Sequence, residues 1–171
     1  QLRVLLVDAT TMKVAMKLFA LFPGRATGKR AKWAGIKLQV GLRLFRNVPE
    51  LQVLSAELQN ELKTLSFLRP VGEPVVYILD LGYWAYHLFD TIIERGQHFL
   101  SRLRHDCNPP ILAVQQGDPV WVGQRLKDVH LTGTQVDLTV RLRGSHPTHP
   151  QMHSDVRLAG IWVATEQAWH L

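Results

Sequence analysis

The chain has 171 residues, of which 46% are hydrophobic and 20% charged, a composition typical of one globular domain or of a domain with an insertion. Its single cysteine, Cys107, excludes an internal disulfide, and no apolar run approaches the roughly 20 residues of a membrane-spanning helix. We therefore expect a soluble, cytoplasmic protein without a membrane partner, and the net charge of +6 favours polyanions as partners.

The first half of the chain is predicted to alternate strands and helices. Residues 3–8 read as a buried strand and 11–16 as a second extended segment. Alternating apolar residues over 36–44 predict a half-buried strand whose polar face carries Lys37 and Gln39. A helix, a strand, a helix closed by a glycine and a further strand should follow, over about 56–67, 75–81, 84–93 and 99–104.

The second half is predicted to consist of strands. Beyond Asn108-Pro109-Pro110, strand-like runs are separated by glycine, proline and aspartate turns, and no helix pattern occurs between about 105 and 160. These strands are expected over 111–115, 120–126, 136–142 and 156–164. The predicted fold class is therefore α/β, with a β subdomain that is inserted or appended.

The positive charge is concentrated near the N-terminus, where every charged residue between Asp8 and Glu50 is basic. These residues are Lys13, Lys17, Arg25, Lys29, Arg30, Lys32, Lys37, Arg43 and Arg46. Such a positive electrostatic field attracts nucleic acid, although a solvated basic loop would give the same sequence pattern. We expect Arg30 and Lys32 to contribute to DNA binding.

Two apolar runs, VLLVD and VYILD, each lead into an aspartate, Asp8 and Asp80. In open α/β sheets ligands gather at the carboxyl ends of strands, so aspartates on neighbouring strands can converge. Two carboxylates held close together suit Mg²⁺ or Mn²⁺, and such sites serve metal-dependent phosphoryl transfer. The alternative is structural: Asp8 opens a turn toward Thr10, and Asp80 caps the helix that follows.

Three stretches resemble the catalytic domain of bacterial insertion-sequence DDE transposases: LLVDATTM, AGIKLQVGL and YILDLGYWAYHLFDTIIERGQHFLSRLR. The resemblance covers nearly the whole chain. It implies a ribonuclease H-like core with an inserted, mainly antiparallel β subdomain. On this basis 1–104 are assigned to a partial catalytic core, 105–160 to the β insertion and 161–171 to the start of a return to the core.

The resemblance also implies roles for individual residues. Asp8 and Asp80 match the first two catalytic, metal-binding acids of the family. Arg102 matches an arginine that contacts a DNA phosphate, and Lys37 falls where the family often has a lysine on its long strand. Leu81 departs from the arginine that frequently follows the second acid, which weakens a DNA contact there.

The third acid of the family, in a Tyr-x-x-Arg-x-x-x-Glu pattern, is absent. Glu166 is the only glutamate after residue 94 and thus the one alternative candidate for this acid, but it lacks tyrosine and arginine at the required offsets. The chain is therefore expected to be a fragment without the third acid, inactive by itself.

The implied function is Mg²⁺- or Mn²⁺-dependent cleavage and strand transfer of transposon-end DNA. Its partners would be duplex DNA at transposon ends and targets, and a second subunit in a full-length homodimer at the bacterial nucleoid. A non-catalytic DNA-binding remnant and an unrelated metal-dependent phosphatase or nuclease are the alternatives. A haloacid-dehalogenase phosphatase is disfavoured because Thr10 stands where that family has a second aspartate.

Overall fold

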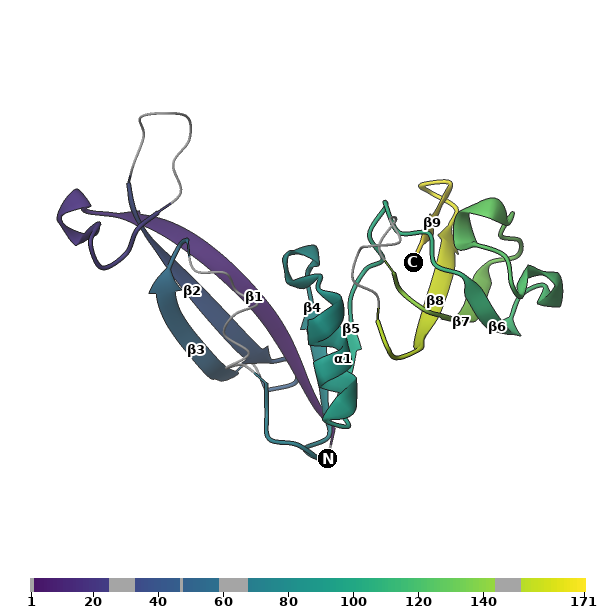
Figure 1. The fold of residues 1–171 in the computed structure, drawn as a ribbon, viewed down its shortest axis with the longest axis horizontal. Coiled ribbons are helices and arrows are strands. Elements are labelled where there is room, and N and C mark those ends of the chain that lie inside the picture. The colour runs from purple at the N-terminus through teal and green to yellow at the C-terminus, as the bar shows by residue number, and fades with distance from the viewer. Residues whose placement is uncertain (1, 25–32, 47, 59–67, 144–151) are drawn as a thin grey trace.

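The computed structural model describes residues 2–24, 33–46, 48–58, 68–143 and 152–171. These residues form a mixed α/β structure that is mostly sheet, with strands in two separate sheets and one α-helix (Figure 1). The five-stranded sheet has the order β3-β2-β1-β4-β5. Its strands are β1 (Arg3–Val14), β2 (Ala34–Arg43), β3 (Val48–Ala56), β4 (Val75–Leu79) and β5 (His98–Leu100).

β1 lies at the centre of this sheet and has a different partner on each side. It pairs antiparallel with β2 from Leu5 to Val14, but parallel with β4 only from Arg3 to Val7. The prediction of two separate extended segments was wrong, because the ladder to β2 keeps the chain extended beyond Asp8. The second half of β1 thus continues past the end of β4. A short 3₁₀ helix, η1 (Met16–Leu18), follows it.

The prediction of which face of β2 is buried was also wrong. Lys37 is only 6% exposed and Gln39 only 1%, whereas the apolar neighbours Ile36, Leu38 and Val40 are half-buried. The register explains this difference, since Gln39 lies opposite Ala9 on the core face of the sheet. The Gln39 amide satisfies its buried donor by hydrogen bonding to the Tyr83 hydroxyl, at 3.3 Å.

The predicted helix that follows β4 is confirmed as α1 (Tyr86–Glu94), after a 3₁₀ turn η4 (Leu81–Tyr83). Leu88, Phe89 and Ile92 are fully buried and belong to the same apolar cluster as the core face of β1 and β4. Phe89 also stacks on Phe99, with ring centroids 4.2 Å apart. Gly96 ends the helix as expected: its φ of +69° suits glycine, and its N–H bonds to the Ile93 carbonyl.

The four-stranded sheet is antiparallel throughout, in the order β6-β7-β8-β9. Its strands are β6 (Ile111–Gln116), β7 (Gln135–Val140), β8 (Val156–Val163) and β9 (Ala168–His170). The strand predicted at 120–126 is replaced by two 3₁₀ helices, η5 (Pro119–Trp121) and η6 (Leu126–Asp128). The Asp118 carboxylate accepts the Val120 N–H and Pro119 begins η5, so local turn chemistry prevails over the apolar pattern.

The other predicted elements differ from the structure at their ends. β5 stops at Leu100, before the end of the strand expected over 99–104. Ala56 ends β3 and does not begin a helix, and most of the helix predicted there, 59–67, lies outside the described residues. No helix of the described residues is long and apolar enough to cross a membrane.

The two sheets share one apolar cluster and are joined by polar contacts. The Leu103 N–H donates to the Leu171 carbonyl at 2.9 Å. This bond ties the segment that follows β5 of the first sheet to the residue that follows β9 of the second. Asp90 on α1 accepts the N–H groups of His153 and Ser154 just before β8. The predicted end of the β insertion, residue 160, falls within β8, and β9 pairs with β8. Residues 161–171 therefore continue in the second sheet.

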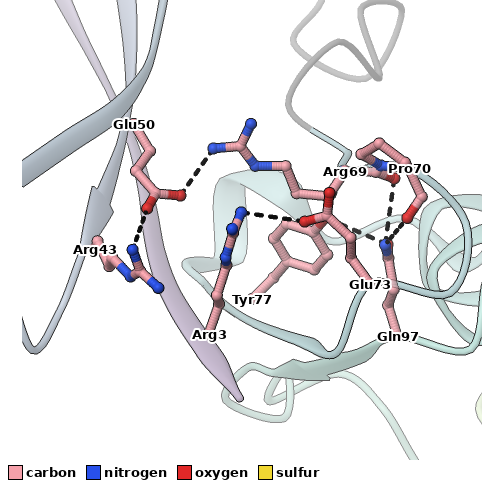
Figure 2. Close-up of polar contacts among 8 residues, drawn as sticks. All are labelled: Arg3, Arg43, Glu50, Arg69, Pro70, Glu73, Tyr77 and Gln97. Carbon is pink, nitrogen blue, oxygen red and sulfur yellow. Dashed lines mark hydrogen bonds and ion pairs between the residues drawn. The ribbon is translucent and has the colours of Figure 1, made fainter. Parts of the chain in front are cut away.

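A charged network holds the end of the first sheet where β1 and β4 begin (Figure 2). Glu50 on β3 lies between two guanidinium groups, Arg43 at 3.1 Å and Arg69 at 2.8 Å. The buried Tyr77 hydroxyl accepts the Arg69 backbone N–H and donates to the side-chain oxygen Oε1 of Gln97 at 3.2 Å. Glu73 also pairs with Arg3 on β1, so residues 69–73, which lead into β4, are tied to β1, β3 and β4.

Replacing Glu50 by glutamine should lower the free energy of unfolding by about 2 kcal/mol, since two partly buried charge-assisted bonds are weakened. Urea unfolding would measure this. Glu73→Gln is the matched control: Glu73 pairs with Arg3, but both side chains are 36% exposed, so its loss should cost less than about 1 kcal/mol. Equal effects of the two substitutions would contradict the importance of the Glu50 pairs.

Candidate functional site

Asp8 and Asp80 lie side by side on neighbouring strands. β1 and β4 are parallel, and Val7 is paired with Leu79, so each aspartate is the next residue along its strand. Val7 and Leu79 face the core and are buried, whereas both aspartates are exposed on the opposite face. Asp80 follows the end of β4 as predicted; Asp8 lies within β1, at the point where its pairing with β4 stops.

Each aspartate uses one carboxylate oxygen for a local hydrogen bond. Asp8 Oδ1 accepts the Ala9 N–H at 2.7 Å, and Asp80 Oδ1 accepts the Gly82 N–H at 2.8 Å as the N-cap of η4. The capping role considered for Asp80 is thus present. Among the described residues neither carboxylate forms an ion pair, so the second oxygen of each is left for another partner.

Both aspartates line a cavity of about 1670 Å³ between the first sheet and the second. The first sheet contributes its exposed face, including Leu6, Ile78 and Leu100. The opposite side is formed by the segment after β5, by the residues between η6 and β7, and by β8 and β9. Within the described part of the chain, Asp8 and Asp80 are the only acids of the lining, whereas its bases are Arg102, Arg104, His105, Lys127, His130, Arg157 and His170.

The residues predicted to bind DNA are placed very differently. Arg102 is exposed, lines the cavity and has no ion-pair or hydrogen-bond partner within the described part of the chain. Lys37 is buried on the core face of β2, where its ammonium is not presented to a polymer outside. Arg30 and Lys32 lie outside the described residues.

Glu166 and Cys107 both have structural explanations. Glu166, weighed as a third acid, does not line the cavity, and its carboxylate lies 2.7 Å from the His170 ring. Cys107 does line the cavity, but burial raises the pKa of its thiol, which keeps it protonated and unreactive at neutral pH. Within the described ranges, no three His, Cys, Asp or Glu side chains are grouped so that they could hold a metal ion.

Sequence reasoning missed the basic residues that η6 and β8 contribute to the cavity. Of these residues, Arg157 pairs with Asp137, and this hydrogen bond lowers the pKa of the Asp137 carboxyl. Lys127 has no carboxylate partner among the described residues. Neither residue belongs to a recognisable motif, because their position depends on how the two sheets pack.

Comparison with known proteins identifies the family. A family model described as "Transposase DDE domain" matches residues 1–158. The chain belongs to this family. It is also similar to the transposase for insertion sequence element IS231B of Bacillus thuringiensis subsp. berliner, with 33% identity over 110 residues. The corresponding IS231E transposase of subsp. finitimus is 34% identical over the same length.

This is the family that the stretches around Asp8 and Asp80 resemble. Each similarity to an IS231 transposase covers 60% of this chain and 21% of the relative, so the matched segment spans about a fifth of those proteins. Among the residues that the structure describes, Asp8 and Asp80 are the only acids that line the cavity of this family member.

Proposed function

We propose that this chain is part of a DDE transposase that cleaves transposon-end DNA and joins the freed strand to a target. The main observation in support is that Asp8 and Asp80 lie on adjacent parallel strands at the edge of a large cavity. A cavity of about 1670 Å³ exceeds the roughly 300–1,000 Å³ of small-molecule sites, which favours a polymeric substrate.

We further infer that the first sheet is the core of a ribonuclease H-like domain. The mixed five-stranded sheet, with α1 on one face and the two aspartates on the other, supports this inference. The second sheet would be the β insertion that follows the second acidic block. The domain limits at 104 and 160 stay predictions, and the second of them would divide β8.

The two aspartates fit a divalent cation, Mg²⁺ or Mn²⁺. Each has a carboxylate oxygen without a protein partner in the described residues, and Mg²⁺ typically binds through one or two carboxylates plus substrate phosphates. In a two-metal site, one such ion would activate the attacking oxygen and a second would stabilise the leaving one.

Within this proposal, the protein groups orient the DNA and balance its charge. Asp8 and Asp80 are held rigidly by β1, β4 and their own backbone hydrogen bonds, which keeps the carboxylates preorganised. Arg102, exposed and unpaired in the described structure, would neutralise a phosphate beside the scissile bond. The proposal also includes DNA at transposon ends as the substrate, a second subunit as a partner, and the bacterial nucleoid as the location.

The test is an assay of the full-length protein on duplex DNA that carries the ends of its own element. We expect nicking at the element ends in Mg²⁺ or Mn²⁺ and none in excess EDTA. DNA binding without nicking in any metal would favour the non-catalytic remnant. Hydrolysis of a small phosphate monoester without action on DNA would favour the phosphatase alternative.

A further inference from the structure

The cavity has acids on one side and bases on the other. Both acids come from the first sheet. Lys127, His130 and Arg157 come from the second unit, by which we mean the four-stranded sheet and the segments between its strands, which include the 3₁₀ helices η5 and η6. Three bases of the lining already have a carboxylate partner: Arg104 pairs with Asp106, Arg157 with Asp137, and His170 with Glu166. Among the described residues, Arg102 and Lys127 are the Lys or Arg side chains of the lining that keep an unbalanced charge.

Lys127 is held in place by contacts far along the chain. Its backbone N–H donates to the Asn108 side-chain oxygen at 2.8 Å, and its ammonium donates to the His105 carbonyl at 2.5 Å. The preceding Leu126 is buried, and its N–H bonds to the Pro109 carbonyl at 3.0 Å. An ammonium has three donors, so two remain for a ligand after the bond to His105.

We infer that Lys127 forms a phosphate-binding site on the second unit, which holds the DNA backbone against the aspartate pair. This inference rests on the proposed function and extends it to the β-rich part of the chain. The ligand is a phosphodiester of the DNA strand in the cavity, because a cation without a carboxylate partner faces a polyanion there. Fixing the ammonium beforehand reduces the entropy lost when the phosphate binds.

The experiment compares two neighbouring substitutions with the same change of charge, Lys127→Gln and Arg125→Gln. Arg125 is exposed and two positions away, but it does not line the cavity. Binding of the full-length protein to a mixed-sequence 30-base-pair duplex is measured by fluorescence anisotropy in EDTA over a range of salt concentrations. EDTA separates DNA binding from metal-dependent chemistry.

Lys127→Gln should reduce the slope of log affinity against log salt by about 0.9, the value for one neutralised phosphate. The same relation corresponds to about eightfold weaker binding at 0.1 M salt. Arg125→Gln should leave the slope nearly unchanged, and Lys127→Arg should keep most of the affinity. Circular dichroism melts of each variant establish that it is folded.

The possible results separate this inference from the proposed function. Equal slopes for Lys127→Gln and Arg125→Gln, in a protein that still binds and nicks DNA, would overturn the phosphate site alone. A protein that binds no duplex at low salt would overturn the site and the proposed function together. If Lys127→Gln does not fold, Lys127→Met and Lys127→Arg provide the comparison, with the stem of the side chain retained.

Discussion

Replacing Asp8 or Asp80 by asparagine is expected to reduce metal-dependent nicking by the full-length protein at least about a hundredfold. Asparagine keeps an oxygen that can accept the Ala9 or Gly82 N–H, so the local hydrogen bonds should survive. What is lost is the negative charge that would hold a divalent cation, and losing one preorganised electrostatic partner typically costs ~10²–10³ in rate. Nicking of labelled duplex under single-turnover conditions measures the effect.

Asp118→Asn is the matched control for this experiment. Asp118 caps η5 through the Val120 N–H, just as Asp80 caps η4, but Asp118 does not line the cavity. Its substitution should leave nicking unchanged. The thermal unfolding temperature should rise with added Mn²⁺ in the unaltered protein and less in the Asp8 and Asp80 variants. Full nicking activity in either variant would remove the catalytic role of that aspartate.

The adjacency of the aspartates was predictable because it depends on local patterns and a general property of sheets. VLLVD and VYILD are both apolar enough to be buried strands, and parallel neighbours place equivalent residues at one edge. The end of β1 was not predictable in the same way. Asp8 looks like the end of a strand, but β2 pairs with β1 as far as Val14.

The orientation of β2 shows where alternation alone is insufficient. Period-two alternation shows that two faces differ, and hydrophobicity suggested that the face with Ile36 and Leu38 is the buried one. The opposite face is buried instead, with Lys37 and Gln39 on it, and the Gln39 amide has a hydrogen-bond partner in Tyr83. Such a partner comes from a distant element and leaves no pattern in the strand itself.

The prediction of a strand at 120–126 was wrong for a local reason. The apolar residues there include Trp121 and Leu126, both buried, but each lies in a 3₁₀ helix and not in a ladder. Gly117, with a φ of +137°, and the Asp118-Pro119 pair turn the chain before a strand can form. Lys127 was missed with the same segment, since its place beside the cavity depends on this turn and on Asn108.

The contact between α1 and the second sheet is the other place where a single substitution should have a large effect. Replacing Asp90 by alanine should lower the free energy of unfolding by about 3 kcal/mol, measured by urea unfolding. Asp90 is only 5% exposed, and its carboxylate accepts the N–H groups of His153 and Ser154 at 3.0–3.1 Å. Hydrogen bonds to a charged group contribute about 1.5–3 kcal/mol each, and alanine leaves both donors unpaired.

Asp90→Ala should also destabilise the structure locally, because the Asp90 bonds fix the residues that lead into β8. Arg157 and Trp162 of β8 line the cavity. Amide hydrogen exchange at His153 and Ser154 should accelerate in Asp90→Ala before exchange in β1 or β4 changes. Glu94→Ala is the control: Glu94 lies one turn further along α1, is exposed and has no partner in the described residues. Alanine favours helix at both positions, so the difference between the two variants isolates the contact with the second sheet. If they unfold within about 0.5 kcal/mol of each other, with equal exchange at His153, Asp90 does not hold the sheets together.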